Sequence, residues 1–259
     1  MKMNMNKKRW LILGACCLIN LCLGSIYAWS VFSASMSEYL SSLTGQSITS
    51  ADLAIVYTVA NSVGPITMIT GGWFNDKFGP KKVLLAGTIM YSIGLILSGF
   101  AVNTSMLLLT YGIIGGLGLG MAYGCTISTA VKYFPDKRGL IGGVTTAVYG
   151  LSSVIVSPII TIIVEKTNAT VAFKGIGMVF LIVMVLCSLM VEACPADFVP
   201  EGYTKQAAVQ SAQVAVDKNW KEMLQTPICY DHFTDLRSFQ WHDDHLTGSR
   251  ACTGNGWND

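Results

Sequence analysis

The sequence predicts an all-α membrane protein, and two observations carry that prediction. Lys, Arg, Asp and Glu occur in short clusters, separated by long stretches that contain none of them. Charged residues make up 12% of the chain and hydrophobic residues 52%, whereas soluble domains carry about 25% charged residues. An apolar stretch of about 20 residues crosses the hydrocarbon core of a bilayer as a helix. We therefore expect an integral, multi-pass protein surrounded by the lipid bilayer.

The charge-free stretches mark where the helices are expected. They cover residues 10–37, 53–75, 83–131, 139–164 and 175–191. The third stretch is long enough for two spans, and Asn103, Thr104 and Ser105 supply a polar turn within it. The sequence therefore predicts a bundle of six transmembrane helices over residues 10–193. The helices are expected at about 10–35, 52–75, 83–101, 106–131, 139–163 and 174–192.

The positive charges indicate the orientation of the bundle. They collect at the N-terminus and in every second loop: Lys2, Lys7, Lys8, Arg9, Lys77, Lys81, Lys82, Lys132, Lys137 and Arg138. The loops 36–52 and 102–105 contain no Lys or Arg, and Lys166 and Lys174 are the exceptions. Because loops rich in Lys and Arg stay in the cytoplasm, we expect residues 1–9 to form a cytoplasmic N-terminus. Residues 194–228 are expected to form a cytoplasmic linker, and the plasma membrane is the expected location.

Glycine recurs at a spacing that favours helix packing. Glycines lie four residues apart at Gly112, Gly116, Gly120 and Gly124, and Gly139 and Gly143 repeat that spacing. Small residues on one helix face let backbones approach closely inside a membrane. The glycines of residues 115–120 also suit a dinucleotide-binding loop, but that loop needs a preceding strand, so this interpretation is the weaker one.

Other classes of function receive little support. No basic face with interleaved aromatic residues indicates nucleic acid, and no Cys-x-x-Cys pair indicates metal or redox chemistry. The sequence His-Asp-Asp-His at 242–245 could be a metal cluster, but no Cys/His pattern surrounds it. The charge-free stretches contain no His, so they offer no nucleophile–base pair for a membrane enzyme. We expect no enzyme activity, no metal and no cofactor.

One loop carries a motif with specific spacing. Residues 72–82 read GWFNDKFGPKK, which resembles the signature loop of the major facilitator superfamily, Gly-x-x-x-Asp-(Arg/Lys)-x-Gly-x-(Arg/Lys)-(Arg/Lys). An ordinary cytoplasmic loop would explain the lysines but not the spacing of Asp and Gly. We expect the first glycine to permit close helix contact and the second to permit a tight turn. The resemblance implies a role in setting the conformation for Gly72, Asp76, Lys77, Gly79, Lys81 and Lys82.

Further segments resemble the oxalate/formate antiporter branch of that superfamily. They are GSIYAWSVF at 24–32, KYFPDKRG at 132–139 and NWKEMLQTP at 219–227, and the resemblance covers about residues 8–228. It implies a fold of two six-helix halves, in which residues 10–193 form the N-terminal half. The chain departs from the wider superfamily because its fourth span has no Arg. That departure weakens any comparison with proton-coupled members.

The branch lines its carboxylate pocket with aromatic side chains from the N-terminal half, and three tyrosines here match those positions. They are Tyr27, Tyr123 and Tyr149, and each lies in an apolar span where its hydroxyl needs a partner. The alternative for each residue is a tyrosine that packs between helices and bonds to a neighbouring backbone. Tyr27 and Trp29 lie two residues apart, so they cannot share one helix face.

The resemblance implies a secondary active transporter of small carboxylate anions, of the oxalate/formate antiport type. In that branch the cationic residues that hold the substrate lie in the other half, and no Lys or Arg lies deep in a span here. A buried anion needs such a counter-charge, so we expect this half alone not to transport. The alternative is a non-transporting membrane subunit, or a half-transporter that acts through self-association. The exact substrate and the mode of coupling stay open.

The last segment departs from the apolar pattern. After Ile228, where a seventh apolar helix is expected, residues 229–259 are polar and aperiodic, and we expect this aberrant tail to be disordered. Reading the codons in a shifted frame permits a largely apolar decoding of residues 230–245. Our hypothesis is a frameshift near Ile228 that truncates a twelve-helix transporter. The nucleotide sequence decides between an intact apolar frame and one interrupted by stop codons.

Overall fold

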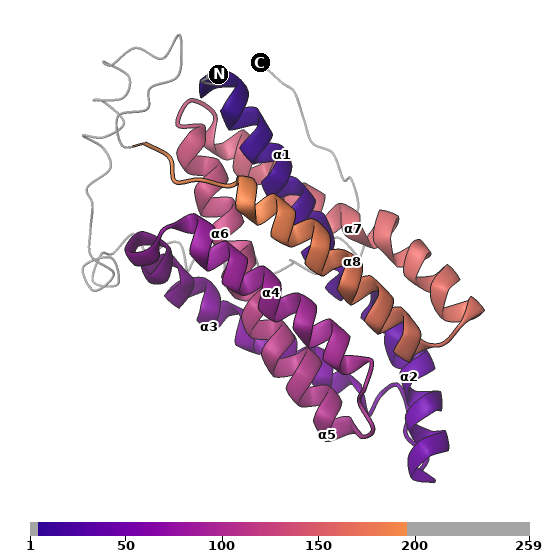
Figure 1. Ribbon diagram of the computed structural model, residues 1–259. Coiled ribbons are helices and arrows are strands. Elements are labelled where there is room, and N and C mark those ends of the chain that lie inside the picture. Colours follow the sequence, from indigo (N-terminus) through magenta and orange to yellow (C-terminus); the bar gives the residue numbers. More distant parts are fainter. Residues whose placement is uncertain (1–4, 196–259) are drawn as a thin grey trace, which may run out of the picture. The chain divides into compact units, whose positions relative to one another are not determined.

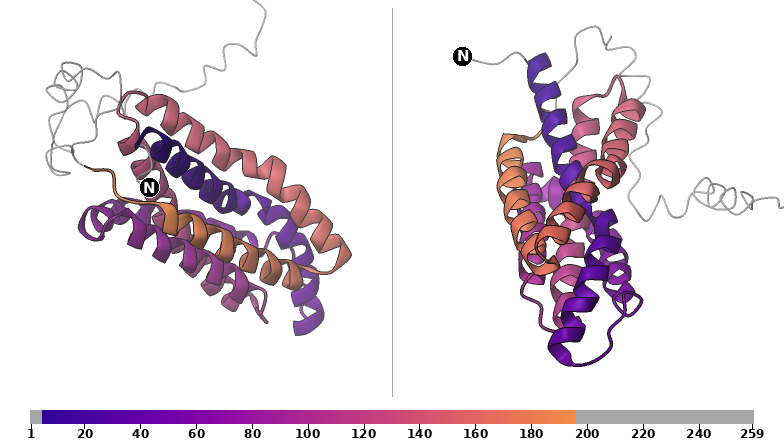
Figure 2. Two further views of the ribbon diagram at one scale, coloured as in Figure 1. Left: turned by 45° about the horizontal axis from the view of Figure 1, so that its top comes forward. Right: turned by 90° about the vertical axis from the view of Figure 1, so that its right-hand side faces the viewer.

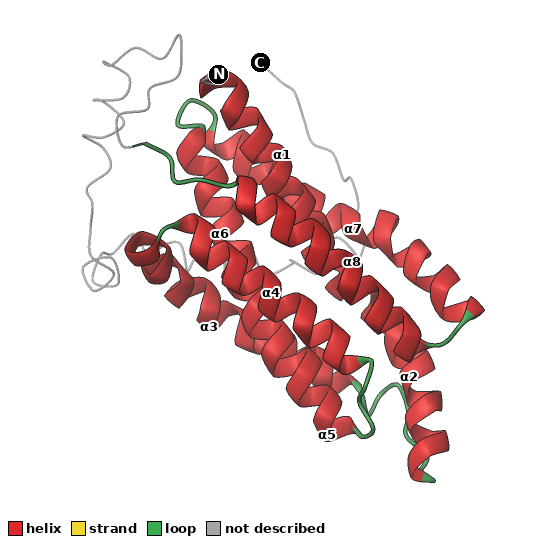
Figure 3. Cartoon of the chain, in the orientation of Figure 1, coloured by secondary structure: helices red, strands yellow, loops and turns green. Residues whose placement is uncertain are grey.

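The computed structural model describes residues 5–195, apart from the side chains of Met5 and Asp76. These residues all belong to one compact unit, Met1–Tyr203. The described part is helical and contains no strand (Figure 1, Figure 3). The predicted linker at 194–228, apart from its first two residues, and the predicted tail at 229–259 lie outside the described residues.

The helical segments follow one another with short connections. In chain order they are α1 (Met5–Leu23), the 3₁₀ turn η1 (Gly24–Ala28), α2 (Trp29–Thr44), α3 (Ala54–Phe78), α4 (Pro80–Ser98), α5 (Thr104–Leu107), the π-helical segment η2 (Leu108–Gly115), α6 (Gly116–Tyr133), α7 (Arg138–Lys166) and α8 (Ala169–Met190). The first three form one continuous helical stretch, and so do α5, η2 and α6. The order of long stretches therefore matches the six that the sequence predicts.

Within residues 5–195, five stretches are long and apolar enough to cross a membrane. They are Asn6–Thr44, Pro80–Ser98, Thr104–Tyr133, Arg138–Lys166 and Ala169–Met190. The remaining long helix, α3, has 25 residues but is not among them, because polar residues such as Asn61 and Thr67 lower its hydropathy. The prediction of an all-α membrane protein is confirmed.

The first stretch runs further than the predicted 10–35. Met36 and Leu40 are fully buried, so the helix gains packing contacts beyond residue 35. It ends at Gly45, whose φ of 70° is left-handed and whose N–H donates to the carbonyl oxygen of Ser41 at 3.0 Å. Glycine tolerates this conformation without a steric penalty, and it is a common way to end a helix.

The last helix begins before the predicted residue 174. The side chain of Asn168 accepts a hydrogen bond from the backbone N–H of Val171 at 2.9 Å and so caps the start of α8. Lys174 therefore lies inside the helix, where its Nζ is 3.8 Å from the centroid of the Phe100 ring. This cation–π contact gives the ammonium group a partner near the helix end.

Helix α6 lies between α3 and α4 and packs closely against both (Figure 1). A Cβ added to Gly120 would lie 1.9 Å from the carbonyl oxygen of Gly64 in α3, and one added to Gly118 would lie 2.4 Å from the backbone nitrogen of Tyr91 in α4. Only glycine permits such approaches. The packing role predicted for the glycines at 112–124 is confirmed.

The other two glycines of the predicted repeat behave differently. A Cβ added to Gly139 or Gly143 of α7 would have no atom within 4 Å, and both residues are exposed. The prediction that they pack against a neighbouring helix is wrong for the described bundle. Helix α7 instead contacts α1 through other residues, and α1 lies between α7 and α8 (Figure 2).

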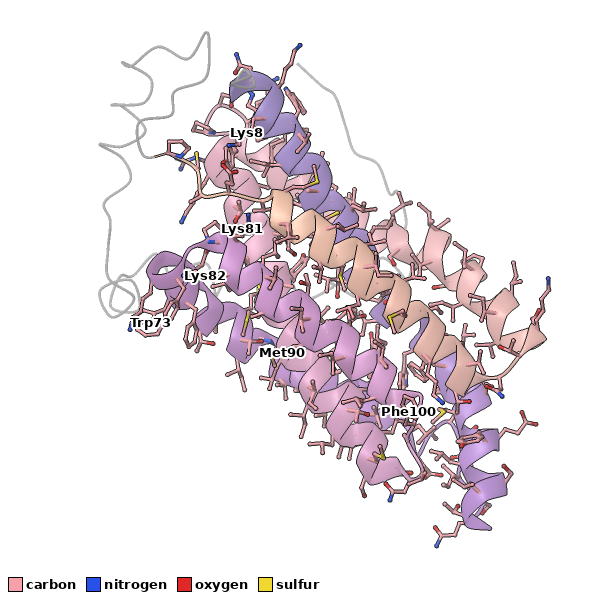
Figure 4. All side chains as sticks on the ribbon, in the orientation of Figure 1. Lys8, Trp73, Lys81, Lys82, Met90 and Phe100 are labelled. Atoms are coloured by element: carbon pink, nitrogen blue, oxygen red, sulfur yellow. The ribbon has the colours of Figure 1, made fainter. Side chains whose placement is uncertain are left out.

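Charged residues gather at one end of the bundle. Lys8 forms an ion pair with Glu192, and Arg9 Nη1 lies 3.5 Å from Asp136 Oδ1. The Arg9 guanidinium also lies 4.9 Å from the centroid of the Phe134 ring. Figure 4 shows Lys8, Lys81 and Lys82 toward this end, with Phe100 toward the other. These contacts tie the start of α1 to the α6–α7 loop and to the segment after α8.

The glycine packing predicts a contrast between two substitutions. We expect Gly120→Ala to lower the free energy of unfolding by about 1–3 kcal/mol, because the added methyl group overpacks the α3–α6 contact. The matched change Gly143→Ala meets open space and should leave stability unchanged or raise it by up to about 1 kcal/mol. Denaturation of both variants in detergent measures the difference. Equal effects of the two changes would contradict the packing role of Gly120.

The ion pair at the charged end predicts a dependence on pH. Hydrogen bonding to Lys8 holds the pKa of Glu192 below its usual value of 4.5, so the folded state binds a proton less readily than the unfolded state. The bridge therefore contributes stability above the usual pKa, and that contribution is lost as the pH falls through the lowered one. Because the pair is exposed, we expect less than about 1 kcal/mol. Thermal scans should show that Glu192→Gln removes this part of the acid sensitivity, whereas Glu38→Gln on α2 does not.

Candidate substrate-binding site

The three tyrosines singled out in the sequence lie next to one another. Tyr149 of α7 is in the middle: its ring centroid lies 5.3 Å from that of Tyr27 in η1 and 4.7 Å from that of Tyr123 in α6. The ring planes meet at 69° and 45°, and edge-on or tilted contacts are favourable for aromatic pairs. Three segments that are far apart in the sequence thus meet at one place. That these residues bind substrate stays a prediction.

Gly24 allows η1 to approach α7. A Cβ at residue 24 would lie 2.2 Å from the carbonyl oxygen of Tyr149 and 2.5 Å from the Cβ of Ser152. A side chain there would push the two segments apart. The absence of one lets Tyr27, three residues later, reach the ring of Tyr149.

Tyr27 and Trp29 lie on different sides of the first helical stretch, as their spacing predicts. Tyr27 is 46% exposed, whereas Trp29 is 7% exposed. The Trp29 ring packs against Tyr111 of η2, with 4.6 Å between the ring centroids. Tyr27 is therefore accessible to a ligand, while Trp29 anchors the segment in the core.

A pocket of about 160 Å³ lies beside the tyrosines, between α3, α6 and α7. Its lining residues are Asn61, Gly64, Pro65, Met68, Leu119, Gly120, Tyr123 and Tyr149. None of these lining residues carries a formal charge, so the pocket offers hydrogen-bonding groups in an otherwise apolar wall. Among the described residues, no group of three or more His, Cys, Asp or Glu side chains is placed to hold a metal ion.

Asn61 is a polar lining residue that sequence reasoning missed. Its Nδ2 donates to the carbonyl oxygen of Tyr57 at 2.9 Å, and an amide has both further donor and acceptor capacity. The signal was available in the sequence, because a side-chain amide inside an apolar span marks a polar site. Asn61 and the two tyrosines of the lining are the groups that can orient a polar ligand.

Buried hydrogen bonds hold the segments that carry the tyrosines. Asn20 of α1 is fully buried: its Oδ1 accepts from Thr126 Oγ1 at 2.7 Å, and its Nδ2 donates to the carbonyl oxygen of Thr145 at 3.3 Å. Thr126 lies one turn from Tyr123, and Thr145 lies one turn from Tyr149. A buried amide that is bonded on both sides fixes its neighbours strongly, because leaving either partner unpaired is costly. Asn20 thus positions α6 and α7 around the site.

The loop motif spans the junction of α3 and α4. Gly72, Asp76 and Lys77 lie in α3, and Lys81 lies in the first turn of α4 with Lys82. Between the helices Gly79 has a φ of 82°, so the prediction of a tight turn at Gly79 is confirmed. A residue with a side chain would be strained in this conformation.

Gly72 does not have the predicted close helix contact. A Cβ added there would have no atom within 4 Å, so no described residue packs against this glycine. The reason lies in the position of α3, whose contacts with α6 run through Gly64 and Gly71 instead. The conformational role of the motif stays a prediction.

Comparison with known proteins identifies the family. The model of the Major Facilitator Superfamily matches residues 16–238, which is more than half of the chain. The chain belongs to the Major Facilitator Superfamily. The predicted family is confirmed, and with it a transporter family rather than an enzyme family.

Three relatives are similar to parts of this chain. The uncharacterized MFS-type transporter YhjX of Escherichia coli (strain K12) is 30% identical over 192 residues, which cover 74% of this chain and 46% of that protein. The oxalate:formate antiporter of Oxalobacter formigenes is 28% identical over 222 residues, covering 85% and 49%. The probable sulfoacetate transporter SauU of Cupriavidus necator is 30% identical over 135 residues, covering 52% and 31%. The chain thus spans about half the length of the first two relatives.

Proposed function

We propose that the chain forms one wall of a secondary active transporter for small carboxylate anions, with oxalate/formate antiport as the nearest type. The observation that carries this proposal is the convergence of Tyr27, Tyr123 and Tyr149 beside a small pocket. The relatives support the substrate class, because one is named as an oxalate:formate antiporter and another as a probable sulfoacetate transporter.

The chemistry of the pocket suits a small anion. A tyrosine hydroxyl donates a hydrogen bond, and a carboxylate accepts one, so phenols bind carboxylates without a formal charge of their own. The pocket of about 160 Å³ is smaller than the roughly 300–1,000 Å³ of sites for drug-sized ligands. We infer that the ligand has only a few non-hydrogen atoms.

The anion also needs a counter-charge, which the described lining residues do not supply. An unpaired charge inside a membrane is costly. Transporters of this superfamily bind substrate near the midplane between two halves, so we expect the cation to come from a facing half. The N-terminus is proposed to be cytoplasmic, because Lys and Arg gather at one end of the bundle. The plasma membrane is the proposed location.

Uptake of labelled oxalate or formate into vesicles tests this proposal. The experiment compares this chain with a version in which the frameshift hypothesised near Ile228 is reversed. We expect transport only from the version with the reversed frameshift. Within it, Tyr149→Phe should weaken substrate affinity by about 10- to 100-fold, because a hydrogen bond to a charged group is lost. Tyr39→Phe on α2 is the matched control. If Tyr149→Phe and Tyr39→Phe behave alike, the tyrosines pack between helices and do not bind substrate.

The open face of α7 favours a second candidate, a half-transporter that acts by self-association. Gly139, Gly143 and Gly150 are exposed, and a Cβ at any of them would have no atom within 4 Å. Small residues on one face allow close helix association in a membrane. Two copies joined through α7 would place two bundles face to face.

The size of the detergent-solubilised chain tests this second candidate. We expect a dimer that Gly143→Leu converts to a monomer, because the bulky side chain keeps the helix backbones apart. Gly175→Leu on α8 adds the same bulk at another glycine with open surroundings and should leave the dimer intact. A monomer from the unsubstituted chain excludes self-association through α7 and leaves the first proposal standing.

A further inference from the structure

An apolar pocket of about 290 Å³ lies where α3 ends and α4 begins. Its walls are nearly all hydrocarbon, and its lining residues are Phe74, Phe78, Lys82, Val83, Ala86 and Met121. Helix α6 contributes Met121, and the end of α3 and the start of α4 contribute the other lining residues. This pocket shares no lining residue with the pocket beside the tyrosines.

Exposed aromatic rings flank the pocket. Trp73, Phe74 and Phe78 are 60%, 39% and 48% exposed. The rings of Trp73 and Phe74 lie 5.0 Å apart, and those of Phe74 and Phe78 lie 6.0 Å apart, centroid to centroid. Tryptophan is enriched at the headgroup level of a bilayer, and Trp73 lies near the end of α3. The mouth of the pocket is therefore expected at the membrane surface.

The segment that borders the pocket carries positive charge. Residues 72–82 contain three lysines and one aspartate, and Lys82 is the charged residue among the described lining. Figure 4 shows Lys81, Lys82 and Trp73 at the same end of the bundle. Lys77 lies over Trp73, with 4.8 Å from its Nζ to the ring centroid. Neither ion pair of the described residues includes Lys82.

The position of Lys82 is unfavourable unless an anion lies nearby. It is in the first turn of α4, which begins at Pro80, and the N-terminus of a helix carries a partial positive charge. A cation there is repelled, whereas an anion is attracted both by the helix end and by the lysine. Apolar walls with a positive mouth match a molecule that has an acyl chain and an anionic headgroup.

We propose that this pocket binds an anionic phospholipid, with one acyl chain against Phe74, Ala86 and Met121 and the phosphate held by Lys82. Basic pockets between helices on the cytoplasmic side are suited to anionic lipid headgroups. A soluble anion would not use the apolar walls, and a zwitterionic lipid carries no net negative charge to balance Lys82. The proposal depends on the membrane class of the protein and not on its substrate.

The test measures lipid binding to the purified full chain in detergent. Phosphatidylglycerol should raise the Tm and stay bound in native mass spectrometry, whereas phosphatidylcholine with the same acyl chains should do neither. Lys82→Gln should weaken phosphatidylglycerol binding about fivefold, and Ala86→Trp should block it by filling the pocket. Lys137→Gln and Ala147→Trp, an exposed lysine and an exposed alanine outside the pocket, are the matched controls and should bind normally.

A second measurement keeps the test decisive if a variant does not fold. Brominated acyl chains quench nearby tryptophan, and Trp73→Phe identifies the contribution of Trp73 to the fluorescence of the chain. Brominated phosphatidylglycerol should quench Trp73 more strongly than brominated phosphatidylcholine. Equal quenching by the two lipids, or equal loss of binding in Lys82→Gln and Lys137→Gln, would overturn the proposal. If inorganic phosphate alone raised the Tm as much as phosphatidylglycerol does, the pocket would be an anion site and not a lipid site.

Discussion

Close backbone contact between α6 and its two neighbours is the constraint on which the rest of the bundle depends. Lipid tails are as apolar as leucine, so burial of apolar side chains gives helices in a membrane little reason to associate. Dispersion between closely packed atoms must supply the attraction, and it falls quickly when a gap opens. Gly120 meets Gly64 of α3 on one side of α6, and Gly118 meets Tyr91 of α4 on the other. A side chain at Gly120 would separate α6 from α3, and one at Gly118 would separate α6 from α4.

Close glycine contacts also determine the geometry of the candidate substrate-binding site. Gly64 and Gly120, which join α3 to α6, also line the pocket beside Tyr123. Gly24 performs the equivalent task for η1 and α7 and so brings Tyr27 to Tyr149. The site is therefore formed where side chains are missing, and its aromatic groups occupy the edges of these close contacts.

The sequence predicted the helical stretches and the packing role of the glycines at 112–124, because both depend on residue type and spacing. The three tyrosines were singled out through a resemblance; the structure places their rings together, and their role in binding substrate stays a prediction. The sequence did not predict the 3₁₀ turn at 24–28 or the π-helical segment at 108–115, since a change of hydrogen-bond register leaves hydropathy unaltered. It also placed the start of α8 too late. The expected start at residue 174 followed the charge of Lys174, whereas the helix begins directly after Asn168, whose side chain caps its first turn. The spacing of Gly139 and Gly143 equals that of Gly116 and Gly120, yet only the latter have a neighbour. Spacing describes a helix face, and the tertiary structure determines what covers it.

The open face of α7 has a mechanical consequence. Where side chains of two helices interdigitate, each must leave the hole that it occupies before either helix shifts, so the contact fixes the register. Gly139, Gly143 and Gly150 place no atoms beyond the backbone on their face of α7, and the exposed side chains beside them, Thr146 and Ser153, are small. A helix seated there meets few side chains and can translate or tilt without lifting far away from the surface. Such a face lets contact and movement coexist, whichever helix occupies it.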